Sequence, residues 1–453
     1  MSNFFYRNLK KTYPIVKEAR GVWITDKDEN VYLDGCSGAV VSNFGHNVQE
    51  INEAITRQLQ LYAFAHTSQF VSDAGLDLAK KLVQLSPPSF RDGGRVYFCS
   101  GGSEAVETAL KMARGYFVEK GERERNICFS RWHGYHGSTL GALSVTGHPA
   151  RRRPYIPLLR PATHITSDYR YRCKCGYGPG PCPAKECVLE RANELEDAIL
   201  LHGPENVMAF IGEPVVGATL GAAVPGSSYW PRIREICSKY GVLFIADEVM
   251  TGLGRTGTYF GIDNWGVEPD LITLGKGLSA GYMPLGAVVA SPKIVREFEE
   301  NRGYFEHGFT YSGHPVSCAA GLAAIEYLLE NDLVRQVKER ESAFFRHLDA
   351  LKEFDFVGDV RGRGFMAGIE FVKDKRTKEP FDSSLAVSHL ITKQAAIHGL
   401  LVYPGSAFID GKSGDHIMIA PPFNITDGEL EQLFQRLLKT LKVAQKELSA
   451  CRT

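Results

Sequence analysis

The chain has 453 residues, 44% of them hydrophobic, which is enough to bury a sizeable core and to divide into two domains or more. Lysine plus arginine and aspartate plus glutamate both number 52, so the charge balance does not favour nucleic acid or an anionic membrane as a partner. No run of about 18 apolar residues could span a membrane, and the N-terminal sequence lacks the apolar core of a signal peptide, so we expect a soluble, cytoplasmic protein.

The N-terminal segment is predicted to be a short arm followed by two strands. GVWITDKDENVYLDG, residues 21–35, holds two strand-like pieces joined by the polar turn Asp26–Asn30. No low-complexity linker interrupts the chain. We therefore expect residues 1–60 to form an arm that rejoins the C-terminal part.

A strand, a glycine turn and a helix are predicted around residue 100. Val96–Cys99 is typical of a short strand, SGGSE follows it, and apolar residues at helical spacing come next. A helix N-terminus with free backbone N–H groups and a hydroxyl favours phosphate, which makes Gly102 and Ser103 candidate ligands. Ordinary capping of the helix by Ser103 is the alternative.

Four cysteines mark a change of composition in YRYRCKCGYGPGPCPAKEC, residues 169–187. Cys173, Cys175, Cys182 and Cys187 supply enough thiolates for a tetrahedral zinc, but neither half has the paired spacing usual in structural sites. Zinc ligation, a redox-labile disulfide and an unligated surface insertion are all open, and the last is favoured. We predict no metal in the catalytic site.

Residues 240–286 hold two apolar runs, each followed by a charged residue. Val242–Ala246 is typical of a buried parallel strand with Asp247 at its end, and Leu271–Leu274 repeats the pattern before Lys276. Ligands of open α/β sheets bind beyond the carboxyl ends of the strands, so we expect Asp247 and Lys276 to meet over one ligand. A lysine can form a Schiff base with an aldehyde while a carboxylate holds a pyridinium nitrogen protonated, as pyridoxal phosphate (PLP) catalysis requires. Two solvated loop charges are the alternative.

The spacing ADEVMTGLGRTG…PDLITLGKGLSAGYMPLGA closely resembles the signature of the class III PLP-dependent aminotransferases, the group that includes the omega-aminotransferases. The resemblance covers nearly the whole chain, from about Gly21 to the last helix. It implies the PLP-dependent transferase fold type I, with a large domain built on a mostly parallel mixed sheet and a smaller α/β domain. We place the N-terminal arm at residues 1–60, the large PLP-binding domain at 61–328 and the small domain at 329–453.

The resemblance also implies a role for each candidate residue. Lys276 would hold the cofactor and act as general acid and base, and Asp247 would keep the pyridine nitrogen protonated. Gly102 and Ser103 would hold the phosphate. The other implied cofactor contacts are Tyr135, His136, Glu213, Val249 and Thr310.

Three of these contacts carry structural expectations of their own. Both Trp132-His133-Gly134 and Tyr135-His136-Gly137 fit the family's aromatic element, and Tyr135 is preferred because STLG after it continues the match. Its ring would stack on the pyridine face. Val249, expected on the same strand face as Asp247, would pack on the opposite face. Thr310 would reach the cofactor phosphate of the neighbouring subunit, which implies a homodimer with shared active sites.

The implied reaction is a transamination. The amino group would pass from a primary amine or omega-amino acid to a keto acid such as pyruvate or 2-oxoglutarate by a ping-pong mechanism. Several omega-aminotransferases carry a carboxylate-binding arginine just after the strand that corresponds to Leu400–Tyr403, and this chain has none there. We therefore expect donors whose reacting amine is remote from an acid group. An aminomutase or a decarboxylating aminotransferase of the same fold is the alternative.

Overall fold

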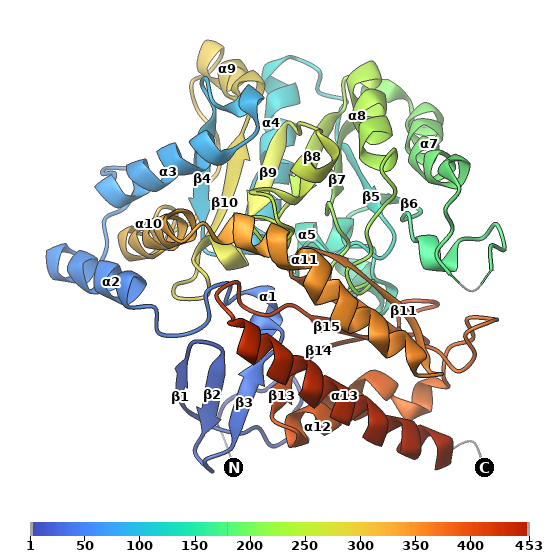
Figure 1. Ribbon diagram of the computed structural model, residues 1–453. Coiled ribbons are helices and arrows are strands. Elements are labelled where there is room, and N and C mark those ends of the chain that lie inside the picture. Colours follow the sequence, from blue (N-terminus) through green and yellow to red (C-terminus); the bar gives the residue numbers. More distant parts are fainter. Residues whose placement is uncertain (1–2, 179, 451–453) are drawn as a thin grey trace.

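A seven-stranded mixed sheet forms the centre of the molecule (Figure 1). The computed structural model describes residues 3–178 and 180–450 of the chain. The strands of this sheet are β4 (Arg95–Cys99), β5 (Ile127–Arg131), β6 (Thr163–Ile165), β7 (Val207–Gly212), β8 (Leu243–Asp247), β9 (Leu271–Leu274) and β10 (Gly286–Ala290). Their order is β4-β10-β9-β8-β7-β5-β6. The strands from β6 to β9 are parallel and β10 is antiparallel to both neighbours, which confirms the mostly parallel mixed sheet predicted from the sequence.

Helices cover both faces of this sheet, so its strands are apolar on both sides. Every residue of β7 and β8 is buried, which explains why these strands are continuous apolar runs in the sequence. Phe210 and Phe244 pack on one face, whereas Ile211 and Ile245 pack on the other. The first face is covered by α3 (Asp73–Leu85), α7 (Lys185–His202), α8 (Tyr229–Tyr240) and α10 (Pro315–Glu330), and the second by α4 (Gly102–Glu119), α5 (Leu140–Val145) and α9 (Pro292–Glu300).

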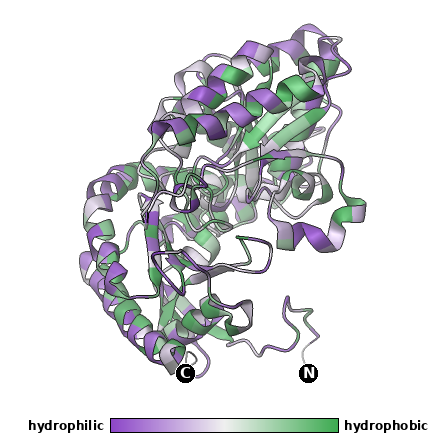
Figure 2. Ribbon diagram, turned by 90° about the vertical axis from the view of Figure 1, so that its right-hand side faces the viewer, coloured by the Kyte–Doolittle hydropathy of each residue, from purple (hydrophilic) through white to green (hydrophobic). Residues whose placement is uncertain are grey.

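The distribution of hydropathy follows these layers. Figure 2 shows central strands that are largely green and outer helices that alternate between purple and green, as expected of helices with one apolar face. Helix α10 is buried around most of its circumference, because α3 and α2 (Gln49–Leu61) both pack on it. Among the described residues, no helix combines the length and apolar composition needed to cross a membrane.

The N-terminal strands belong to a sheet that is completed by the C-terminal part of the chain. Strands β1 (Val16–Arg20), β2 (Trp23–Asp26) and β3 (Val31–Asp34) form an antiparallel meander, and β3 pairs in parallel with β13 (Leu400–Leu401). The short helix α1 (Ser37–Val40) follows β3. The arm thus joins the C-terminal part, while the boundary at residue 60 stays a prediction.

The C-terminal third forms a second α/β layer (Figure 1, orange and red). Its antiparallel sheet has the order β11-β12-β15-β14. The elements are α11 (Leu333–Asp349), β11 (Val357–Arg363), β12 (Met366–Phe371), α12 (Val387–Ile397), β14 (Tyr403–Ser406), β15 (Asp415–Ile419) and α13 (Asp427–Ala450). Helix α13 begins with a capping box, since the Thr426 backbone N–H donates to the Glu429 carboxylate and the Glu429 N–H donates to the Thr426 hydroxyl.

One buried arginine connects the loop after β8 to the N-terminal segment and to the C-terminal layer. Arg255, in the loop after β8, donates from Nη1 to the carbonyls of Phe365 (2.9 Å) and Pro421 (2.6 Å). Its Nη2 donates to Oδ1 of Asn43 at 2.7 Å, and its guanidinium lies 4.4 Å from the ring centroid of Phe423. Burial lowers the pKa of Arg255 to about 9.

Candidate active site

The carboxyl ends of the central strands bring most of the predicted site residues into one cavity. They lie at or after the carboxyl ends of five strands, β4, β5, β7, β8 and β9. This edge is where ligands of open α/β sheets bind. The cavity has a volume of about 170 Å³ and is lined by Gly102, Ser103, Tyr135, His136, Gly137, Glu213, Ala218, Asp247, Val249, Met250 and Lys276.

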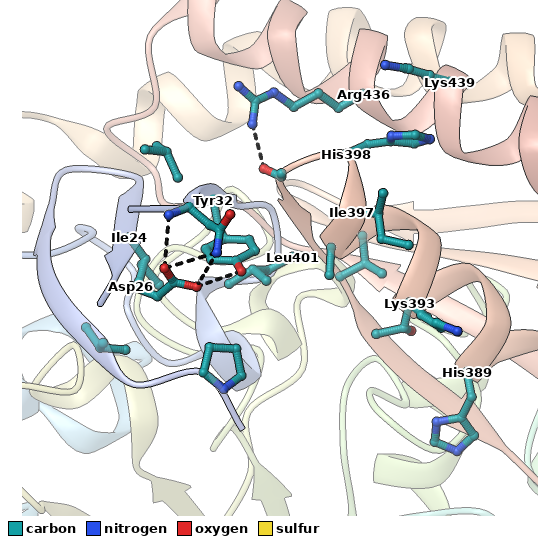
Figure 3. Close-up of a pocket in the computed structure, with 18 of the residues that line it drawn as sticks. Ile24, Asp26, Tyr32, His389, Lys393, Ile397, His398, Leu401, Arg436 and Lys439 are labelled. Atoms are coloured by element: carbon teal, nitrogen blue, oxygen red, sulfur yellow. Dashed lines mark hydrogen bonds between the residues drawn. The ribbon is translucent and has the colours of Figure 1, made fainter. Parts of the chain in front are cut away.

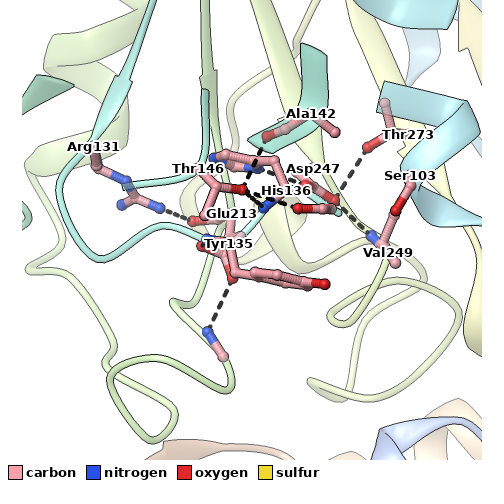
Figure 4. Close-up of polar contacts among 12 residues, drawn as sticks. Ser103, Arg131, Tyr135, His136, Ala142, Thr146, Glu213, Asp247, Val249 and Thr273 are labelled. Atoms are coloured by element: carbon pink, nitrogen blue, oxygen red, sulfur yellow. Dashed lines mark hydrogen bonds and ion pairs between the residues drawn. The ribbon is translucent and has the colours of Figure 1, made fainter. Parts of the chain in front are cut away.

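Asp247 is buried at the end of β8 and its carboxylate is held by three groups (Figure 4). Oδ2 lies 2.6 Å from Nδ1 of His136, while Oδ1 accepts from the Thr273 hydroxyl and the Val249 backbone N–H, both at 3.1 Å. A buried carboxylate with charge-assisted and neutral donors around it is fixed in orientation. It therefore presents one negative charge at a defined point of the cavity wall.

Lys276 follows β9 and reaches the same cavity from the neighbouring strand end. Its backbone has φ of 45°, in the left-handed region, between Gly275 and Gly277. Burial lowers the pKa of Lys276 to about 8, although the nearby carboxylates of Asp247 and Glu213 act in the opposite direction. The amine is therefore far more often neutral near pH 7 than an exposed lysine would be.

Glu213 follows β7 and is also buried. Its Oε2 accepts from the backbone N–H of Tyr135 at 3.0 Å, and its Oε1 accepts from that of Gly217 at 3.2 Å. Burial raises the pKa of this carboxyl, and the nearby negative charge of Asp247 adds to the rise. Glu213 thus fixes the loop that carries Tyr135.

The N-terminus of α4 forms part of the cavity wall. Gly101 is the N-cap and makes no side-chain cap, so Ser103 does not cap the helix as the alternative interpretation required. The Ser103 hydroxyl instead accepts from the backbone N–H of Ser138 at 3.1 Å. Within the described residues, the backbone N–H groups of Gly102 and Ser103 donate no hydrogen bond. They are free to bind an anion at the positive end of the helix.

Tyr135, rather than Trp132, lines the cavity. Trp132 is 42% exposed and stacks on His164, with ring centroids 4.6 Å apart. The Tyr135 hydroxyl lies 3.0 Å from Oγ of Ser138, and the Arg151 guanidinium lies 4.5 Å from the centroid of the Tyr135 ring. The preference for Tyr135 over Trp132 thus agrees with the geometry, while its stacking role stays a prediction.

Val249 was expected on the strand with Asp247, and this is wrong. Strand β8 ends at Asp247 and Val249 lies in the following turn, because its N–H is held by the Asp247 carboxylate. Its side chain nevertheless lines the cavity and packs against Gly102, where an added Cβ would come within 2.7 Å of Val249 Cγ1. The turn, not the strand, delivers this side chain.

Thr310 is the predicted site residue that lies outside the cavity. It is exposed in the turn before α10 and does not line the cavity of its own chain. The role of Thr310 therefore stays a prediction.

The sequence did not point to Gly137, Ala218 and Met250, which line the cavity, or to two residues that act on its charged groups. Thr273 was treated only as part of an apolar strand, although its hydroxyl bonds Asp247 from the adjacent strand. Arg151, in α6 (Pro149–Arg152), lies close enough to Lys276 to act against protonation of the amine. The run Arg151-Arg152-Arg153 was the available signal, but nothing in the sequence brings it to residue 276.

A larger hollow of about 1,400 Å³ lies between the β2–β3 hairpin and the helices α12 and α13 (Figure 3). None of the predicted site residues lines it. Its carboxylate, Asp26, accepts bonds from Asn30 and from the Tyr32 hydroxyl, so it serves the turn between β2 and β3. The smaller cavity at the strand ends is therefore the candidate active site.

The chain matches the family model described as "Aminotransferase class-III" over residues 4–441. It is 39% identical to "Uncharacterized aminotransferase YodT" of Bacillus subtilis over 99% of both chains. It is 37% identical to "Putrescine--pyruvate aminotransferase" of Pseudomonas aeruginosa, covering 96% of this chain and 92% of the relative.

Two solved structures extend the similarity to the fold. An (S)-enantioselective omega-transaminase from Thermomicrobium roseum matches with a TM-score of 0.88 at 37% identity, covering 96% of this chain and 93% of the other. An amine transaminase from an uncultivated Pseudomonas species, in a PLP-bound form, matches with a TM-score of 0.90 at 33% identity, covering 98% and 99%. These matches span both the central sheet and the C-terminal layer.

Proposed function

The chain belongs to the class III aminotransferases and is a transaminase with the PLP-dependent transferase fold type I, and on this premise we propose its cofactor sites, substrates and assembly. The cofactor is pyridoxal 5′-phosphate, as the family implies. The donor is a primary amine or omega-amino acid and the acceptor is a keto acid such as pyruvate or 2-oxoglutarate. The two half reactions follow one another by a ping-pong mechanism.

The observation that carries the proposal is the meeting of a buried carboxylate and a lysine of lowered pKa in one cavity beside a free helix N-terminus. The residues present fit the cofactor. Gly102 and Ser103 would bind the phosphate, Asp247 the pyridine nitrogen, and Lys276 the aldehyde carbon. When bound, PLP supplies an electron sink that stabilises a carbanion at the substrate carbon.

The chain's own groups would then handle the protons. Lys276 Nζ, partly neutral near pH 7, would accept the proton from the substrate carbon as general base and, once protonated, would act as general acid. The Asp247 carboxylate would favour a protonated pyridine nitrogen, and its bond to His136 Nδ1 holds the carboxylate in place. Tyr135 and Val249 would contact opposite faces of the ring, and Glu213 keeps the Tyr135 loop in position.

Substrate choice is proposed from the positions of the cations. The segment Leu400–Gly405 carries no arginine, so a donor carboxylate has no partner there. Arg151 lies beside the Tyr135 ring and would bind the carboxylate of the keto acid. The similarity to a putrescine–pyruvate aminotransferase supports a donor without an α-carboxylate.

A homodimer with shared active sites completes the proposal. The cavity of about 170 Å³ is smaller than the roughly 300–1,000 Å³ typical of ligand pockets, so one chain offers only part of the wall. The exposed Thr310 would contribute its hydroxyl to the neighbouring cavity. A cytoplasmic location stays a prediction from the sequence.

The test is the near-ultraviolet and visible absorbance of the protein loaded with PLP. We expect a yellow band that bleaches with putrescine and returns with pyruvate, and slower bleaching with a short α-amino acid. Lys276→Ala should lose the cycle, whereas Lys239→Ala, at an exposed surface lysine, should retain it. Turnover without any keto acid would indicate an aminomutase instead, and a band that never bleaches would contradict transamination.

A further inference from the structure

The four cysteines of residues 173–187 come together at one point of the surface. Their Sγ atoms all lie within 4.8 Å of one another, and Cys175 and Cys182 are 3.5 Å apart. Cys182 is buried, Cys173 and Cys187 are half-buried, and Cys175 is exposed. The irregular spacing in the sequence therefore conceals a compact set of four thiols.

We propose that Cys173, Cys175, Cys182 and Cys187 bind one structural zinc ion through four thiolates. A tetrahedral zinc with Zn–S bonds of about 2.3 Å places its sulfurs ~3.8 Å apart, which matches the observed cluster. Four thiolates leave no open coordination position, so the site would be structural and not catalytic. A mononuclear ion also fits better than an iron–sulfur cluster, which would separate its cysteines around a larger body.

The observed distances favour an ion over disulfides. A disulfide joins two sulfurs at about 2.05 Å, and the 3.5 Å between Cys175 and Cys182 is not a bond. All four cysteines are free thiols, and each has three sulfur neighbours where a disulfide would need only one. Four sulfurs within 4.8 Å of one another can all reach one central ion.

The polypeptide holds the four positions without a core of its own. Cys173 follows a single turn of helix, and Cys187 lies in the first turn of α7. Between them, the Cys182 backbone N–H donates to the Arg170 carbonyl at 2.9 Å, and the Arg170 Nε returns a bond to the Cys182 carbonyl at 2.7 Å. Small segments with few apolar residues commonly need a metal or disulfides to hold one conformation.

Nearby cations would offset the charge of the site. A zinc ion with four thiolates carries a net charge of −2. The Lys378 ammonium and the Arg191 guanidinium both interact electrostatically with Cys173. Lys378 also donates to the carbonyls of Tyr171 (2.6 Å) and Gly180 (3.2 Å), so a cation is fixed beside the thiols.

The cysteine segment also contacts the C-terminal layer. Arg172, one residue before Cys173, donates to the buried Glu370 of β12 at 2.7 Å and to the Lys378 carbonyl at 2.7 Å. Arg361 of β11 pairs with the same carboxylate at 2.9 Å. Zinc at the cysteines would fix the position of Arg172 and thereby this contact between the central sheet and the C-terminal layer.

The direct test measures metals in the PLP-loaded full-length protein, purified without a metal-affinity step. We expect about one zinc and no stoichiometric iron per chain. Cys182→Ser and Cys187→Ser should each lose most of the zinc, whereas Cys318→Ser, at a buried cysteine of α10, should retain it. Titration with a mercurial should release the zinc as four thiols react.

Cobalt provides a readout that does not depend on how the variants fold. After exchange of the wild-type protein into Co²⁺, we expect the intense thiolate-to-cobalt absorbance of a tetrahedral site with four sulfurs. Stoichiometric iron would overturn the assignment to zinc. Less than about a tenth of a zinc per chain after refilling under reducing conditions, or a mass showing disulfides in freshly purified protein, would overturn the metal site.

Discussion

At the level of single residues, the proposed chemistry depends on how the surroundings shift the pKa of Lys276. Burial removes water from the ammonium and lowers its pKa to about 8, while Asp247 and Glu213 oppose the change. The resulting pKa lies below that of an ordinary lysine and above 7. Such an amine is a better nucleophile and proton acceptor than a surface lysine.

The first prediction concerns Asp247→Asn. Removing this negative charge takes away a contribution that raises the pKa of Lys276, so the pKa should fall further, by roughly half a unit to one unit. In cofactor-free protein, the rate of reaction with pyridoxal phosphate should rise with pH through about 8 in the wild type and through a lower pH in the variant. Stopped-flow absorbance against pH measures both midpoints.

The matched control is Asp77→Asn, at an exposed position of α3, which should leave the midpoint unchanged. A midpoint that moves upward in Asp247→Asn would contradict this account of the electrostatics. So would a wild-type midpoint near the pKa of an ordinary lysine.

At the level of elements, the site consists of strand ends that face one helix N-terminus. The turn Ser100–Ser103 must pass close to the turn after β8, because Val249 packs where a side chain at Gly102 would stand. Gly101, its neighbour, has open space around its Cβ position and an extended φ of 174°. Residue 102 therefore has no room for a side chain, whereas residue 101 has room for one.

The second prediction compares Gly102→Ala with Gly101→Ala. The new Cβ at residue 102 would lie 2.7 Å from Val249 Cγ1, which forces the valine or the turn to move at a cost of about 1–3 kcal/mol. Pyridoxal phosphate should therefore bind about tenfold or more weakly to Gly102→Ala. Equilibrium titration of cofactor-free protein measures the affinity.

Gly101→Ala serves as the control, and its affinity should stay within about twofold of the wild type, since its Cβ meets no atom within 4 Å. Equal losses in both variants would indicate that the turn requires glycine for its backbone alone. If both variants keep the wild-type affinity, Val249 moves aside without an energetic cost.

At the level of the whole molecule, buried polar groups connect parts that are distant in the sequence. Arg255 contacts residue 43, residues 365 and 421, and the ring of Phe423. These contacts offset the free-energy cost of burying its charge. Arg255 follows β8, the strand whose last residue, Asp247, lines the cavity. The stability of this connection thus bears on the shape of the site.

The third prediction concerns Arg255→Met. Removal of the guanidinium leaves the carbonyls of Phe365 and Pro421 buried without their donor, so the free energy of unfolding should fall by on the order of 3 kcal/mol. Urea or thermal denaturation of the two proteins measures the change. Arg335→Met, which breaks exposed ion pairs with Asp332 and Glu339, should leave it nearly unchanged.

A loss for Arg255→Met no greater than that for Arg335→Met would contradict the role of Arg255 as a tie. A full loss of folding in Arg255→Met can be examined with Arg255→Lys, which keeps one charged donor. Lysine should recover part of the stability because it can reach one carbonyl but cannot bond to several partners at once.

The sequence by itself determined the strand ends, the family and most of the cavity. Two continuous apolar runs, one ending at Asp247 and one just before Lys276, were enough to predict the strand ends. Strands buried on both faces, and the edge where ligands bind, have local signatures in the sequence. Glycine spacing likewise located the turn at Gly102 that we propose binds an anion. The family resemblance then assigned chemistry to these positions, and the family is confirmed.

Only the tertiary structure decided which distant groups meet. Thr273 and His136 share the Asp247 carboxylate, Arg151 approaches Lys276, and Val249 enters the cavity from a turn and not a strand. The four cysteines, whose spacing left three alternatives open, converge to within 4.8 Å. Contacts of this kind depend on how elements pack across a sheet or fold back through a loop, and local periodicity carries no information about that packing.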